Sequence, residues 1–124
     1  MSIVKAKEHY LGINGNKKHN CAQAVIAGFK DRFSLTDELV AIFAAHGGGK
    51  APGGLCGALY AARHILENVS PGEMEKSSDA FIKTAGSAKC REIRSMKKLS
   101  CLACVEKAAE ILVNIHNCNT VNQL

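Results

Sequence analysis

Apolar residues recur every three or four positions along most of this chain, and no stretch alternates between apolar and polar residues as a half-buried strand would. The periodicity is clearest near the C-terminus, where Cys101, Val105, Ala108, Leu112 and Ile115 lie on one face of a helix. The pattern therefore predicts an all-α fold, a compact bundle of about five to six helices with a glycine-rich loop at residues 47–54.

Residues that start and stop helices separate these periodic segments. Asn20, Thr36, Ser70 and Ser100 are of the types that cap helix N-termini, and Pro71 suits a first helical position. The segment "CREIRSMKKLS", residues 90–100, predicts one or two helical turns without clear limits. The expected helices are, in chain order, 2–13, Asn20 to Phe33, Thr36 or Asp37 to the glycines at 47–49, 55–69, 71–86 and 100–118.

The chain of 124 residues is long enough to bury one core without disulfides, so we expect a single cysteine-rich domain over residues 1–124. Residues 119–124 have the character of a frayed tail. No apolar run approaches the roughly 18 residues of a membrane span, and the first 15 residues lack the pattern of a secretory signal. We expect a cytoplasmic protein without a membrane partner.

The net charge of +5 comes from scattered lysines with only two adjacent pairs. A nucleic-acid-binding surface usually combines clustered basic residues with aromatic residues for stacking, and this chain has four Phe, two Tyr and no Trp. We therefore expect no nucleic-acid partner. A basic surface suits the docking of an acidic redox partner protein. The oligomeric state stays open, and a homodimer is among the alternatives.

Six cysteines are many for a cytosolic chain of this length, because the reducing pool there disfavours structural disulfides. Four of them stand at expected helix starts: Cys21 follows Asn20, Cys56 opens the helix after the glycine-rich loop, Cys90 heads a short segment, and Cys101 follows Ser100. The N-H groups and dipole of a helix N-terminus stabilise a thiolate and lower the cysteine pKa below about 8.5. These cysteines are candidates for metal or redox chemistry, provided that their sulfurs converge.

The stretch "HGGGKAPGGLCGAL", residues 46–59, leads directly into Cys56. Its glycines would allow the backbone to pass close to such a site and to direct N-H groups at negatively charged sulfur. The alternative is a helix stop followed by a flexible connector. A phosphate-binding loop is disfavoured because the stretch lacks the GK[ST] ending and follows no strand. The candidate glycines are Gly47, Gly48, Gly49, Gly53 and Gly54.

The remaining cysteines and two histidines are ambiguous. Cys101 and Cys104 form a CxxC, a spacing shared by thiol oxidoreductases, zinc sites and cluster ligands, but Cys104 fits an inert core position equally well. Cys118 lies at the far end of the same helix, outside the site. His19 and His46 lie close enough to orient the site, supply a proton or bind a metal, although a surface or capping role is favoured for both.

Four segments together resemble a known family. They are "NCAQAV" at 20–25, "GGGKAPGGLCGAL" at 47–59, "CREI" at 90–93 and "CLACVEKAAEIL" at 101–112. The order is similar to that of the redox-active protein family named for its pattern C, GCAxxG, C, C. Taken position by position, the resemblance implies that the family's four cysteines are Cys21, Cys56, Cys90 and Cys101. The chain departs from the pattern where Ala61 and Ala62 stand near an expected glycine, and it adds Cys104 and Cys118.

The resemblance implies redox activity, and a similar module in a multihaem cytochrome is associated with an iron-sulfur cluster. The leading hypothesis is thus an electron-transfer protein with an iron-sulfur cluster, [2Fe-2S] rather than [4Fe-4S], bound by these four cysteines. A thiol-disulfide oxidoreductase that uses a cysteine pair is one alternative. A structural zinc module with four cysteine ligands is another. Whether the protein is an enzyme stays open among these three.

Overall fold

A computed structural model describes the backbone of residues 2–122 and the side chains of residues 2–115. Within that range the chain forms α-helices and no strand, which confirms the all-α prediction. The number of helices is higher than expected, because the short segment after residue 89 forms a helix of its own. The helices are α1 (Ser2–Leu11), α2 (Cys21–Gly28), α3 (Asp37–Ile42), α4 (Gly57–Val69), α5 (Met74–Ala85), α6 (Cys90–Met96) and α7 (Cys101–Asn122).

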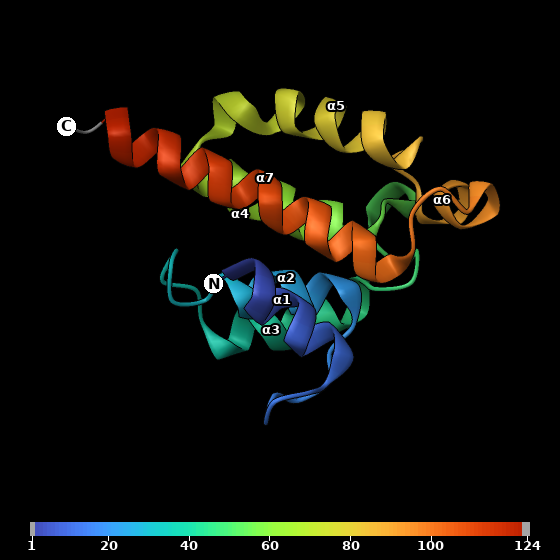
Figure 1. Cartoon of the computed structure of the whole chain (residues 1–124), viewed down its shortest axis with the longest axis horizontal. Coiled ribbons are helices and arrows are strands. Elements are labelled where there is room, and N and C mark those ends of the chain that lie inside the picture. The colour runs from blue at the N-terminus through green and yellow to red at the C-terminus, as the bar shows by residue number, and fades with distance from the viewer. Residues whose placement is uncertain (1, 123–124) are drawn as a thin grey trace.

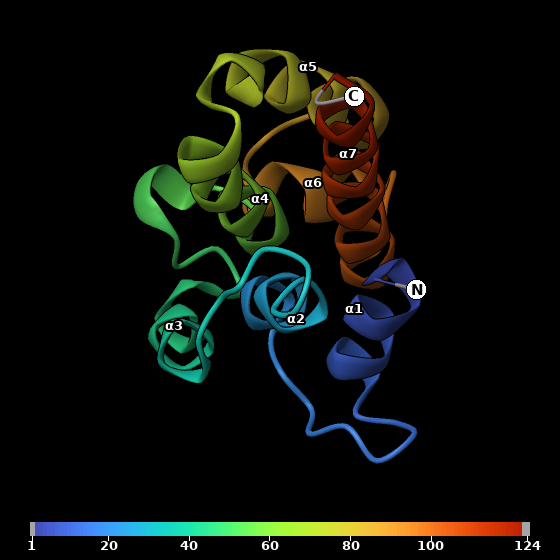
Figure 2. The same ribbon diagram turned by 90° about the vertical axis from the view of Figure 1, so that its left-hand side faces the viewer.

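Helix α7, drawn in red and orange, runs along the molecule, with α5 above it and α4 behind it in Figure 1. Helices α1, α2 and α3 form the lower part, and α6 lies at the end where α7 begins. Figure 2 shows α2 in the middle of this lower part, with α1 and α3 on its two sides. Helix α2 contacts α1, α3, α4 and α7, so it is the central element of the fold.

The central position of α2 follows from its sequence, "CAQAVIAG", whose side chains are almost all apolar or small. Asn20 and Gln23 form a capping box: the Asn20 side chain accepts the Gln23 N-H at 2.8 Å, and the Gln23 side chain accepts the Asn20 N-H at 3.2 Å. The predicted extension of this helix to Phe33 is wrong. The α-helix ends at Gly28, and turns follow as far as Ser34, which adopts the left-handed conformation at φ 55°.

Other boundaries differ by smaller amounts. The third predicted helix is α3 followed by a 3-10 turn at Phe43–His46, and Cys56 is the N-cap of α4 rather than a residue inside it. A 3-10 turn at Pro71–Glu73 precedes α5, which stops at Gly86 in the left-handed conformation as expected. Helix α7 continues through Asn122. The tail predicted at 119–124 has no described side chains, and its last two residues lie outside the described backbone.

The core fills the space between α2, α4, α5 and α7. Its largest fully buried side chains are Phe29, Phe81, Ile26, Leu59, Ile65, Leu66, Leu112, Val25 and Val105. Helix α1 packs closely on α2 because Gly28 has no side chain: a Cβ there would lie 2.7 Å from the Cβ of Ala6 and 2.8 Å from its Cα. Within residues 2–122, no helix has the length and apolar character needed to cross a bilayer.

We expect Gly28→Ala to destabilise the fold by roughly 1–3 kcal/mol, because the added methyl group overlaps the backbone of α1 and this overpacking outweighs the gain in helix propensity. Chemical denaturation measures the effect. Gly72→Ala is the matched control, since a Cβ at Gly72 meets no atom within 4 Å. Equal stability of Gly28→Ala and the unmodified protein would contradict the close packing of α1 on α2.

Candidate functional site

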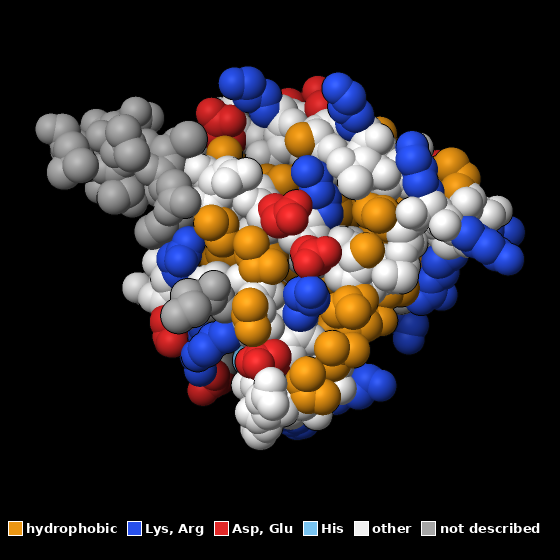
Figure 3. Space-filling view, in the orientation of Figure 1, with side chains coloured by type: hydrophobic (Ala, Val, Ile, Leu, Met, Phe, Trp, Pro, Cys, Tyr) orange, Lys and Arg blue, Asp and Glu red, His pale blue; other side chains and the backbone are white. Residues whose placement is uncertain are grey.

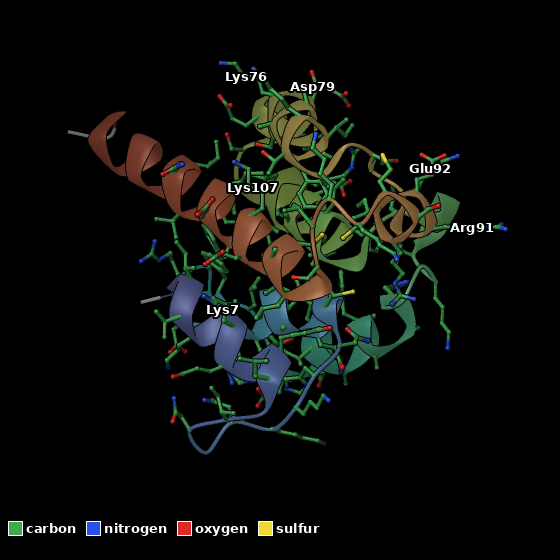
Figure 4. The ribbon with its side chains drawn as sticks, turned by 45° about the vertical axis from the view of Figure 1, so that its right-hand side comes forward. Lys7, Lys76, Asp79, Arg91, Glu92 and Lys107 are labelled. Atoms are coloured by element: carbon green, nitrogen blue, oxygen red, sulfur yellow. The ribbon has the colours of Figure 1, made fainter. Side chains whose placement is uncertain are left out.

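All four cysteines singled out by the sequence stand at helix starts in the structure. Cys21, Cys90 and Cys101 are the first residues of α2, α6 and α7, and Cys56 is the N-cap of α4. They line one cavity of about 20 Å³, which is close to the space needed by one water molecule. Sulfur atoms lie where the start of α7 approaches α4 in Figure 4. Segments from four parts of the chain therefore meet at one point.

The backbone positions two of these helix starts directly. Leu55 and Lys89 form an isolated antiparallel bridge, and the next residue, Cys56, donates its N-H to the carbonyl of Ala88 at 2.8 Å. Cys56 and Cys90 each follow one member of the bridged pair, so α4 and α6 begin beside each other. Because a single bridge produces no alternation of apolar and polar residues, the sequence contains no sign of it.

The glycine-rich loop contributes unevenly to the site. The Gly48 N-H donates a hydrogen bond to the Cys21 sulfur. A Cβ at Gly49 would lie 3.5 Å from the Cβ of Cys90, so this glycine lies against the second sulfur-bearing side chain. Gly47 lies against the Asn20 side chain, where a Cβ would come within 2.6 Å of Cγ. A Cβ at Gly53 or Gly54 would meet no atom within 4 Å, and these glycines have φ of 71° and 73°, so they shape the turn instead.

Gly57, which the sequence analysis did not select, makes the tightest contact with the site. A Cβ at this position would lie 2.7 Å from the sulfur of Cys21 and 2.7 Å from the carbonyl oxygen of His46. Only a glycine therefore lets α4 start against the first turn of α2. The sequence does contain a clue to Gly57, because this glycine directly follows Cys56 in the Cys-Gly-Ala step.

Cys104, one turn into α7, is the fifth cysteine that lines the cavity. Its thiol donates a hydrogen bond to the Cys56 sulfur, and this bond is the main reason why the pKa of Cys56 falls to about 7. Burial of Cys56 opposes the shift, while the N-H groups of Leu59 and Ala58 at the start of α4 and the charge of Arg94 assist it. The same bond, together with burial, raises the pKa of Cys104. The pair therefore loses its first proton from Cys56, while Cys104 stays a thiol.

Burial dominates at two other cysteines. It raises the pKa of Cys21 in spite of the Gly48 N-H, and it raises the pKa of Cys90 in spite of the nearby charge of Arg94. The expectation that every helix start would lower a cysteine pKa is therefore wrong for these two. The cost of burying a charge exceeds what one helix terminus offers.

Cys101 differs from the other four because it is half-buried rather than buried. The Arg94 side chain approaches its sulfur, with Nη2 at 3.9 Å, and the Tyr10 hydroxyl from α1 forms a hydrogen bond with it. Burial of Tyr10 and the proximity of the Cys101 sulfur raise the pKa of Tyr10 to about 12, so the phenol stays protonated. Sequence reasoning missed Tyr10 and Arg94, since neither belongs to a recognisable motif.

The two candidate histidines do not line the cysteine cavity. The His19 ring stacks on His9 with centroids 5.3 Å apart, and burial lowers the pKa of both. His46 packs against Phe43 and Tyr60. Among the described residues, no three His, Cys, Asp or Glu side chains are spaced to hold a single metal ion. The side chain of Cys118 lies outside the described residues.

The sequence profile of the family described as "Putative redox-active protein (C_GCAxxG_C_C)" matches residues 19–115. The chain belongs to this family. The region shared with the C_GCAxxG_C_C family contains all five cysteines of the cavity and the glycine-rich loop, whereas Tyr10 comes from α1, outside it. No curated protein and no solved structure gives a significant match.

We expect the alkylation rate of Cys56 by iodoacetamide, followed by peptide mass spectrometry, to reach half its maximum near pH 7. Cys104→Ala removes the hydrogen-bond donor, so the midpoint should move upward by one unit or more. Cys104→Ser keeps a hydroxyl donor and should give a smaller shift. A midpoint that stays in place in Cys104→Ala would contradict the pairing of the two sulfurs.

Proposed function

We propose that the cysteine cavity is the redox centre of an electron-transfer protein and binds an iron-sulfur cluster, [2Fe-2S], through Cys21, Cys56, Cys90 and Cys101. The observation that carries this proposal is the meeting of four cysteines from four helix starts at one cavity, in a chain of the C_GCAxxG_C_C redox-active family. We also place the protein in the cytoplasm, where the reducing pool keeps thiols available for a cluster.

The donor set suits such a cluster. Sulfur is the only ligand type among the cavity residues, which otherwise comprise Ile93, Arg94 and Leu99. A [2Fe-2S] cluster needs only two cysteine sulfurs at each iron, whereas a mononuclear zinc site needs three or more ligands around one ion. The described side chains are not spaced for the latter. The preference for the cluster over zinc rests on the redox chemistry that the family match indicates.

The cavity is smaller than a cluster, so binding requires the sulfurs to move apart. The exposed Arg94 and the half-buried Leu99 line the cavity near the connection between α6 and α7, residues 97–100. Displacement of these two side chains costs less than displacement of the buried Ile93. We therefore expect the α6–α7 side of the cavity to adjust when the cluster binds.

A bound cluster would supply one-electron chemistry, and the chain's own groups would set its potential. The Gly48 N-H, the Tyr10 hydroxyl and the Arg94 guanidinium each lie at a sulfur and offset negative charge there, which favours the reduced state. Lys and Arg side chains gather at the α6 end of the molecule in Figure 3. This end suits an acidic redox partner protein, which would dock close to the half-buried Cys101.

Single serine substitutions test the ligand set. Cys21→Ser, Cys56→Ser, Cys90→Ser and Cys101→Ser should each lower the iron bound by anaerobically purified protein several-fold, because each removes a thiolate ligand. Cys104→Ser is the matched control within the same cavity and should keep most of the iron. Far-UV circular dichroism verifies that each variant stays helical. Iron content that depends on Cys104 but not on Cys90 would contradict the assignment.

Thiol-disulfide exchange is the second candidate, and the Cys56–Cys104 pair favours it. The Cys56 thiolate would attack one sulfur of a substrate disulfide, which forms a mixed disulfide and releases the first substrate thiolate. Cys104 would then give up its proton to that thiolate and attack the Cys56 sulfur, which closes a Cys56–Cys104 disulfide and releases the second substrate thiolate. Two electrons pass to the substrate, and the protein would be an enzyme.

Mild oxidation of metal-free protein by cystamine tests this candidate. Peptide mapping should find Cys56 joined to Cys104. Cys104→Ser should instead leave one cysteamine on Cys56 as a mixed disulfide, with the other cysteamine released, because the resolving sulfur is absent. A disulfide between Cys21 and Cys90, or no change in the thiol count, would contradict the dithiol mechanism.

A further inference from the structure

A second cavity opens directly onto the cysteine site. It has a volume of about 340 Å³, and its lining includes Tyr10, Lys18, Cys21, Gly48, Arg94 and Cys101. Three of these residues, Cys21, Arg94 and Cys101, also line the smaller cysteine cavity. We call this larger cavity the entry cleft. Two of the five cysteines, Cys21 and Cys101, line it, so a small molecule in the cleft would lie against their side chains.

The entry cleft is positively charged. Lys18 and Arg94 line it, and no Asp or Glu does. The ion pairs found within residues 2–115 join Lys7 to Glu106 and Lys30 to Asp37, so neither cation of the cleft is neutralised by a carboxylate there. The Arg94 guanidinium contacts the Cys101 sulfur instead. Uncompensated positive charge in a concave site attracts anions and raises their local concentration.

The size and the chemistry of the cleft narrow the choice of anion. A volume of about 340 Å³ lies at the lower end of the range for small-molecule sites. Its reactive groups are sulfurs, above all that of Cys101, whose side chain is less buried than that of Cys21. A thiol or disulfide is the kind of small molecule whose own reactive atom matches a cysteine sulfur.

We propose that the entry cleft binds a small organic disulfide or thiol that carries carboxylates. The carboxylates lie toward Lys18 and Arg94, and the ligand's sulfur lies against Cys101. The proposal deepens the redox function proposed above and rests on it for the choice of a sulfur ligand. It concerns binding at the cleft of the metal-free protein, in which the Cys101 sulfur is not an iron ligand.

Two coloured disulfide reagents, one anionic and one neutral, test the proposal. 5,5′-Dithiobis(2-nitrobenzoate) carries two carboxylates, and 4,4′-dithiodipyridine is neutral. The ratio of interest is the rate at which the anionic reagent modifies Cys101 of metal-free protein, divided by the rate for the neutral reagent. We expect Lys18→Gln and Arg94→Gln each to lower this ratio about fivefold at low salt, because one nearby positive charge is lost. Both reagents react with the Cys101 thiolate, so a substitution that changes the thiolate fraction of Cys101 affects both rates equally and leaves their ratio unchanged.

Lys76→Gln is the control. Lys76 is exposed on α5, a helix that contributes no residue to the cleft, and Figure 4 shows its side chain at the top of the molecule. Its substitution should leave the ratio unchanged. A ratio that is the same in Lys18→Gln, Arg94→Gln and the unmodified protein would overturn the proposal. Arg94→Lys keeps the charge and should restore most of the ratio.

A redox-inert probe separates this inference from the redox function. Thiodiglycolate carries two carboxylates and a thioether, so it binds without exchange. In NMR titrations it should shift the amide signals of Lys18 and Gly48 saturably, and Lys18→Gln should weaken its binding about fivefold. Such binding supports the cleft even if the cysteines prove redox-inactive. If the amide signals show no saturable shift while the cysteines still react with the neutral reagent, the proposed binding at the entry cleft is overturned and the redox function stays intact.

Discussion

The site depends on a balance between helix N-termini and burial. Four helix starts meet at one small cavity, and N-H groups of Gly48, Ala58 and Leu59 point at two of its sulfurs, which favours thiolates. The same packing removes water from the sulfurs, which favours thiols. Burial prevails at Cys21 and Cys90, where it raises the pKa, whereas the Cys104 thiol lowers the pKa of Cys56 to about 7. The cavity is therefore suited to holding thiolates when a bound metal supplies the positive charge that balances them.

Small residues make this arrangement possible. Gly28 brings α1 onto α2, which carries Tyr10 to Cys101, and Gly57 brings the start of α4 onto the sulfur of Cys21. Ala61 and Ala62, which stand near an expected family glycine, are both buried in α4. The fold thus achieves close helix contacts near the site through residues without large side chains, and polar ligands other than sulfur are kept out of the cavity lining.

Local signals in the sequence predicted the helices and the helix-start positions of four cysteines, because caps and periodicity act over a few residues. The end of α2 at Gly28 was missed, since the apolar pattern continues through Phe29 and Phe33 while the backbone turns. The Cys56–Cys104 hydrogen bond, the role of Tyr10 and the Leu55–Lys89 bridge depend on contacts between distant segments. No local sequence pattern encodes these contacts. The sequence alone therefore could not decide whether Cys104 is a core residue or part of the site.

The central claim is that the cysteine cavity is a redox centre that holds an iron-sulfur cluster. Its most direct test is the iron and acid-labile sulfide content of protein purified without oxygen, together with the visible spectrum. The account predicts about two irons and two sulfides per chain with charge-transfer absorption. Protein without iron or sulfide, whose thiols are lost in pairs on mild oxidation, would contradict the cluster and leave the Cys56–Cys104 dithiol as the redox group.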